Sequence, residues 1–145
     1  KHASGKLSGE IIAVLAGANP AEVRAGLQAA VQFMKNDAIW YAANEDASIA
    51  FFPHVISRTG SYLSKVCNIA EGEPLAYLVA PPIEGVIALD AALKAAAVRI
   101  VAYTAPPSET NYMGAMLTGD QPACKAAAMA FRDAVLEVAA NPLKY

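Results

Sequence analysis

Few side chains in this sequence have the types and spacing that catalysis requires. His54, Ser57 and Ser61 come closest, since an imidazole can take the proton of a nearby serine hydroxyl and make it a nucleophile. The sequence has no G-x-S-x-G elbow, and no acidic residue stands at a spacing that would orient the histidine. We therefore predict no catalytic residues and no enzyme activity. Ser57 or Thr59 is interpreted instead as the cap of a short helix.

The residue types that commonly bind metals or cofactors are also scattered along the sequence. His2, His54, Cys67 and Cys124 show no ligand spacing, and the sequence lacks a P-loop and a G-x-G-x-x-G motif. We predict no metal site and no resident cofactor. The two cysteines form no CxxC pair, and free thiols in a reducing cytosol are favoured over a disulfide, which stays open as an alternative.

Two polar features remain. Asp90 and Lys94 lie one helical turn apart with the acid first, which is the favourable order for an ordinary exposed ion pair. The stretch 106–111 is stiffened by proline and presents hydroxyl, carboxylate and amide groups together, on Ser108, Glu109, Thr110 and Asn111. From their chemistry alone, these four residues fit either a polar connection between strands or the lining of a ligand site or pore.

The elements that must position these residues follow from hydrophobic periodicity and from glycine and proline breaks. They alternate between strands and helices, which predicts an α/β (α+β) fold. The predicted strands are 10–16, 39–43, 49–57, 75–80, 99–104 and 112–118, and the predicted helices are 20–34, 59–67, 83–96 and 122–139. Asn19 caps the first helix, and residues 119–121 cap the last. Pro53 places its strand at an edge or a bulge.

A local pattern occurs twice. Residues 13–21 align with 115–123 at a constant offset of 102 positions, each with a strand, a glycine turn and a helix started by proline. A true repeat implies a closing strand and helix of a truncated first domain in 1–36 and a complete second domain in 37–145. About 70–80 residues would then precede Lys1. The alternative is coincidence, because this local pattern is common in α/β proteins.

Composition favours assembly over chemistry. Hydrophobic residues make up 56% of the chain and charged residues 17%, so partners are expected to cover much of the surface. A well-packed small soluble protein is the alternative. The net charge of −2 and the absence of a Lys/Arg cluster exclude a nucleic-acid binder. The most apolar stretch, 86–102, contains three charged residues, so no membrane span is predicted.

The sequence from Leu75 to Tyr103 resembles the first strand, helix and second strand of bacterial microcompartment (BMC) shell domains. An acid–glycine step, Glu84-Gly85, starts the helix, and a D-A-x-x-K-A-A stretch at 90–96 closes it. The match is closer to one branch of that family, the ethanolamine-utilisation shell proteins, whose tandem domains are circularly permuted. The strings that carry this closer resemblance are 19–27, 57–64, 76–82, 106–112 and 141–143.

The resemblance implies a circularly permuted BMC domain, with a sheet flanked by helices. It implies a homotrimeric, pseudohexameric tile that packs with other shell proteins in the cytoplasm and lets small metabolites through its pores. Lys94 would lie at the tile edge, and Ser108 to Asn111 would line a pore. Trp40 and Thr110 match wall positions of a small pore that holds ethanolamine. Cobalamin binding is also known in the family, but its residues are not placed here. The alternative function is a small oligomeric α/β module that senses a ligand.

Overall fold

A computed structural model describes residues 14–35, 40–106 and 108–142 of this chain. The chain divides into two compact units, Lys1–Ala38 and Ile39–Tyr145. The first unit contains one described helix. The second contains a five-stranded sheet and three helices within its described residues, and it holds every residue proposed for a site.

The helix of the first unit, α1 (Pro20–Met34), begins where the sequence predicted. Asn19 caps it, because its side chain accepts a hydrogen bond from the backbone N–H of Ala21 at 2.8 Å. None of its residues is buried. Large apolar side chains at its surface include Leu27, Val31, Phe33 and Met34. The predicted strand 10–16 falls largely outside the described residues, and 14–16 form no strand.

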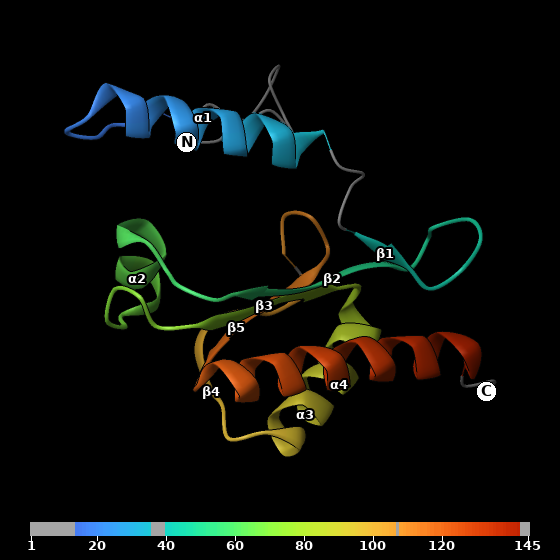
Figure 1. The fold of residues 1–145 in the computed structure, drawn as a ribbon. Coiled ribbons are helices and arrows are strands. Elements are labelled where there is room, and N and C mark those ends of the chain that lie inside the picture. The colour runs from blue at the N-terminus through green and yellow to red at the C-terminus, as the bar shows by residue number, and fades with distance from the viewer. Residues whose placement is uncertain (1–13, 36–39, 107, 143–145) are drawn as a thin grey trace. The chain divides into compact units, whose positions relative to one another are not determined.

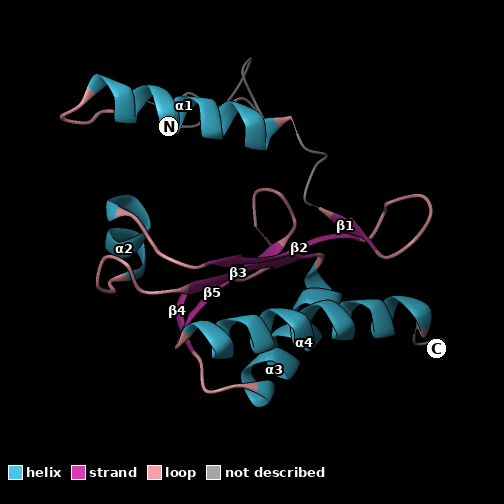
Figure 2. Ribbon diagram, in the orientation of Figure 1, coloured by secondary structure: helices cyan, strands magenta, loops and turns pink. Residues whose placement is uncertain are grey.

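The second unit is built on an antiparallel sheet with the order β1-β2-β3-β5-β4 (Figure 2). Each of the five strands falls within a segment that hydrophobic periodicity predicted. Their bounds are β1 Tyr41–Ala42, β2 Ala50–Ile56, β3 Leu75–Ala80, β4 Arg99–Thr104 and β5 Met113–Thr118. A register shift between Ile100 and Ala102 interrupts the β4–β5 pairing, which the sequence did not predict.

Helices α3 (Pro82–Ala95) and α4 (Gln121–Ala140) cover one face of this sheet (Figure 1). The strands turn alternate side chains toward them, so Ala76, Leu78 and Ala80 are fully buried while Tyr77 and Val79 face the other side. Small residues on α3, among them Ala88 and Ala92, let the helix lie close to the sheet. Phe51, Phe131, Leu78 and Met113 fill the centre of this core.

Pro53 occupies a free edge of the sheet, as predicted. The short β1 pairs with β2 only at Phe51 and Ala50, so from Phe52 onward the described part of β2 bonds to β3 alone. Proline lacks a backbone N–H and is tolerated where no ladder bond is needed. The turn before β2 is held by Asn44, whose side-chain oxygen accepts from the N–H of Ile49 at 3.0 Å.

The predicted cap of the short helix α2 (Ser61–Cys67) was wrong. Its N-cap is Gly60, and no side chain caps it. Thr59 is held instead by backbone bonds, since its N–H donates to the carbonyl of Glu73 at 3.1 Å and its carbonyl accepts from Gly72 at 2.9 Å. Ser57 is also engaged elsewhere, because its hydroxyl accepts a hydrogen bond from the side chain of Gln121 at 3.0 Å. By contrast, Asp120 caps α4 as predicted, accepting from Ala123 N–H at 2.7 Å.

Candidate pore-loop site

The loop between β4 and β5 leaves the sheet on the side opposite α3 and α4 (Figure 1). Ser108 organises its described part. The Ser108 hydroxyl donates to the carbonyl oxygen of Tyr112 at 2.7 Å and accepts from the Tyr112 N–H at 3.1 Å. The Ser108 carbonyl accepts from the N–H of Asn111 at 3.0 Å. The four predicted residues Ser108 to Asn111 therefore form one closed turn.

Asn111 gives this turn its geometry. Its φ of 60° lies in the left-handed region, which asparagine tolerates better than most residues other than glycine. With Asn111 in this conformation, the chain returns to Tyr112 and enters β5 at Met113. Glu109, Thr110 and Asn111 are exposed, whereas Ser108 and Tyr112 are half-buried. The polar groups of the turn thus face solvent while its anchor lies beneath them.

An open hollow of about 330 Å³ lies beside the turn. Three of the predicted loop residues, Ser108, Glu109 and Thr110, line it, and Asn111 does not. The other lining residues come from β3, from the ends of β4 and β5 and from the end of the loop, namely Tyr77, Val79, Thr104, Tyr112, Met113 and Gly114. Sequence reasoning missed Tyr77 and Thr104. Strand alternation could have indicated Tyr77, because its neighbours Ala76 and Leu78 are buried against the helices.

Trp40 does not line this hollow but touches its wall. Its ring meets Tyr112 edge-on with centroids 6.0 Å apart, and it lies 5.5 Å from the ring of Phe52. Phe52 in turn contacts Tyr77 edge-on and stacks on His54. Trp40 and the loop, which are far apart in the sequence, are therefore joined by an aromatic cluster: Trp40, Phe52, His54, Tyr77 and Tyr112.

The hollow presents hydroxyl groups, one carboxylate and aromatic faces. Groups of these kinds can bind a small polar cation. His54 stacks on Phe52 with centroids 5.2 Å apart, and no hydrogen bond joins it to Ser57 or Ser61 among the described residues. The described part of the chain also holds no group of three residues that could bind a metal ion.

Lys94 lies in the last turn of α3, away from the loop. Its ammonium group is 2.6 Å from the carboxylate of Asp90, one turn earlier, and both side chains are well exposed. The predicted ion pair is therefore confirmed. An exposed pair of this kind contributes only about 0–1 kcal/mol to stability, so the fold does not depend on it.

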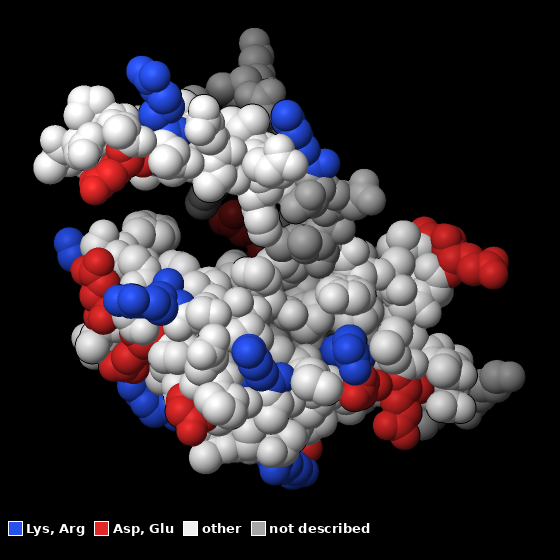
Figure 3. Space-filling model, viewed as in Figure 1, with Lys and Arg blue, Asp and Glu red and all other residues white. Residues whose placement is uncertain are grey.

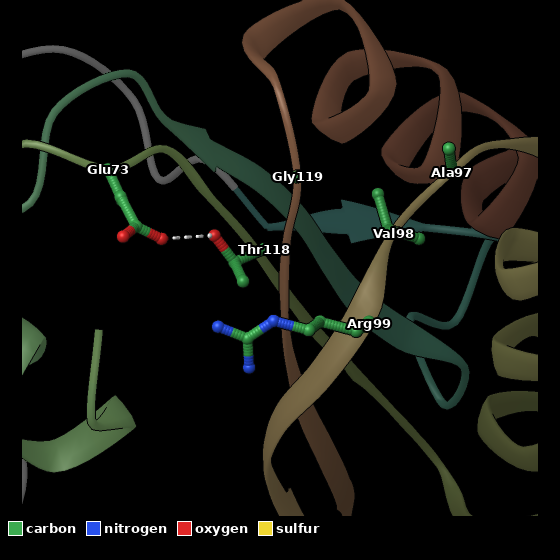
Figure 4. Close-up of a pocket in the computed structure, with 6 residues that line it drawn as sticks. All are labelled: Glu73, Ala97, Val98, Arg99, Thr118 and Gly119. Carbon is green, nitrogen blue, oxygen red and sulfur yellow. Dashed lines mark hydrogen bonds between the residues drawn. The ribbon is translucent and has the colours of Figure 1, made fainter. Parts of the chain in front are cut away.

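A second hollow, of about 460 Å³, lies at the other end of β5 (Figure 4). The hydroxyl of Thr118 donates to the carbonyl of Pro74 at 2.8 Å and lies 3.4 Å from the carboxylate of Glu73. The side chain of Arg99 extends beside this contact. The set contains a cation, an anion and a hydroxyl, and the shorter bond of that hydroxyl goes to a backbone carbonyl. We assign no reaction to it.

On the face drawn in Figure 3, Lys and Arg side chains are interspersed with Asp and Glu, and no continuous basic patch is seen. A phosphate backbone would need such a patch. Among the described residues, no helix is both long enough and apolar enough to cross a bilayer.

The two cysteines are free and buried, with 3% exposure for Cys67 and none for Cys124. Burial raises the pKa of both thiols above their ordinary value of 9.0.

We expect both cysteines to react with a thiol reagent more slowly in the folded protein than in urea, with pH profiles of the reaction rate shifted to the alkaline side. Because folding favours the neutral thiols, their contribution to stability is complete below pH 9.0 and is lost above it. Equal rates in both states would contradict this expectation.

Comparison with known proteins places these features in a wider context. Residues 79–143 match the BMC domain family. The chain is 58% identical over 144 residues to the bacterial microcompartment shell protein EutL of Clostridium perfringens, covering 99% of this chain and 66% of that protein. A crystal structure of EutL from the same organism superposes with a TM-score of 0.81, covering 99% of this chain and 65% of that one.

A second crystal structure agrees with the first. The ethanolamine utilization protein EutL from Leptotrichia buccalis is 62% identical and superposes with a TM-score of 0.77, covering 89% of this chain and 59% of that one. The chain therefore spans somewhat less than two thirds of the length of these relatives. The predicted mixed α/β fold, with an antiparallel sheet flanked by helices as in a BMC domain, is confirmed.

Proposed function

This chain belongs to the EutL family of bacterial microcompartment shell proteins, and from that membership we propose that it is a structural component of such a shell and not an enzyme. The observation that carries the proposal is the high identity to EutL across 99% of the chain. The proposed location is the shell of a microcompartment in the cytoplasm. Its proposed partners are two further copies, in a homotrimeric tile, and other shell proteins at the tile edge.

Exposed apolar surface supports assembly. Ile83, Val86 and Ile87 on α3 are between 42% and 69% exposed, and α1 buries none of its residues. Surface of this kind is costly to leave in water and is typical of subunit interfaces. Low charge content across the chain fits the same interpretation.

The proposed domain organisation is a closing strand and helix of a first BMC domain in 1–36 and a second BMC domain in 37–145. The repeated pattern in the sequence supports it. Both α1 and α4 follow a polar cap, Asn19 in one and Asp120 in the other, with a proline in the first turn. The same local signals thus start both helices.

The proposed pore function rests on the loop. Ser108, Glu109, Thr110 and Asn111 are proposed to line a passage for small metabolites, with Trp40 and Thr110 near a site for ethanolamine. The carboxylate of Glu109 and the aromatic cluster next to it have the chemistry to attract an ammonium group. No residue is proposed for cobalamin.

The native mass of the assembly tests the proposal. Light scattering on a size-exclusion column should give a trimer, or larger particles that electron microscopy resolves as flat layers. A closed oligomer that never forms layers would favour the ligand-sensing alternative. A clean monomer would contradict self-assembly of this chain.

A further inference from the structure

We infer that Ser108 is the positioning residue of the pore loop: its hydroxyl fixes Tyr112, and Tyr112 in turn holds the ring of Trp40. The inference deepens the proposed function, on which its meaning for a pore rests. Two links in series carry it: a pair of hydrogen bonds from the Ser108 hydroxyl to the Tyr112 backbone, and an edge-on contact from the Tyr112 ring to Trp40.

The first link uses the full bonding capacity of one hydroxyl. A serine hydroxyl has one proton to donate and two lone pairs to accept with. The Ser108 proton goes to the carbonyl of Tyr112 at 2.7 Å, and one lone pair takes the Tyr112 N–H at 3.1 Å. The second lone pair faces the hydroxyl of Thr110 at 3.3 Å. An alanine at 108 would leave both backbone groups of Tyr112 without these partners.

These two bonds hold the backbone of Tyr112 just outside the sheet. The ladder between β3 and β5 begins one residue later, at Met113 paired with Ala80, and the residue opposite Tyr112 in that register is Pro81, which has no backbone N–H. Among the described residues, the bonds to the Tyr112 backbone therefore come from Ser108 and not from the strand ladder. The direction of its side chain follows from that backbone.

The second link joins the loop to Trp40. The rings of Tyr112 and Trp40 meet edge-on, an arrangement that aromatic pairs prefer. Trp40 is 48% exposed, so its environment changes readily if Tyr112 moves. In a pore, this arrangement would make the conformation of Ser108 to Asn111 and the position of the Trp40 ring depend on each other.

The sequence supplies its own probe, because Trp40 is the only tryptophan in the chain. In Ser108→Ala, tryptophan emission should shift to the red, and acrylamide should quench it more strongly than in the wild type. Ser108→Thr keeps the hydroxyl and should restore the wild-type spectrum. Thr110→Val removes the neighbouring hydroxyl but leaves both Tyr112 bonds, so it should leave the emission unchanged. Far-UV circular dichroism checks that each variant is folded.

Tyr112→Leu tests the aromatic contact separately from the hydrogen bonds, because it removes the ring and keeps the Ser108 hydroxyl. This variant should show the same red shift as Ser108→Ala. An unchanged spectrum in Ser108→Ala, or a Ser108→Thr variant that behaves like alanine, would overturn the inference. These spectra do not require a pore, an assembly or a ligand. Failure of the shell proposal would instead appear as a monomer in light scattering, with the Trp40 response intact.

Discussion

Lys94→Ala is expected to abolish flat layers while leaving the smaller oligomer intact. Lys94 is exposed at the end of α3, and its local partner is Asp90 alone among the described residues. Loss of such a surface pair costs the fold about 0–1 kcal/mol, and alanine is a better helix former than lysine. The variant should therefore fold normally. Electron microscopy for layers and light scattering for the smaller oligomer would measure the two levels of assembly separately.

Asp90→Asn is the matched control for this substitution. It removes the ion pair but leaves the ammonium group of Lys94 in place, so layers should persist. Lys125→Ala removes an exposed positive charge from α4 and should also leave layers intact. Layers that form unchanged in Lys94→Ala would show that this lysine does not lie at a tile edge. Loss of layers in all three variants would indicate a general effect of charge.

Strands in the second unit were predictable from short apolar runs bounded by breaks in the pattern. Burial alternates along most of β3 and β5, but not along β4. Both ends of β3, Leu75 and Ala80, and both ends of β4, Arg99 and Thr104, lie where periodicity predicted them. Pro74 and Pro81 stop the pattern on either side of β3, and Gly119 stops it after β5. The helices α3 and α4 were likewise predicted to within one residue at each end.

Errors occurred where hydrogen bonds outside the helix and strand patterns fix the backbone. Tyr112 was predicted in a strand, but the hydroxyl of Ser108 takes both of its backbone groups. Thr59 was predicted as a cap, but its backbone bonds to Gly72 and Glu73, residues far along the chain. Neither contact has a signature in local periodicity. Both depend on how the chain returns on itself.

The candidate site also has one part that the sequence predicted and one part that it did not. Ser108, Glu109 and Thr110 are adjacent in the sequence and polar, so their shared position was predictable from the loop alone. From the residues alone, without the family resemblance, nothing linked Trp40 to that loop. Their contact through Tyr112 needs the order β1-β2-β3-β5-β4, which sets β1 and the end of the loop on the same face. Sequence spacing carries no information about that order.

The core between sheet and helices sets the stability of the second unit. Phe131 on α4 is fully buried and is one of the largest side chains in that core. Phe131→Ala should lower the free energy of unfolding by about 3–5 kcal/mol, from lost burial and from the cavity left behind. The whole stability of a typical domain is about 5–15 kcal/mol, so this is a large share. Urea unfolding followed by Trp40 fluorescence would measure it, because Trp40 belongs to the same unit.

Met129→Ala is the matched control, two residues earlier on the same helix. Its side chain is 56% exposed, so the change should stay within about 0.5 kcal/mol. Both substitutions introduce alanine, which favours helix, so helix propensity cannot produce the larger loss. A similar small effect from both would mean that α4 is not held against the sheet by Phe131. A large effect from Met129→Ala alone would mean instead that a partner covers the outer face of α4, which is the outcome expected of a subunit interface.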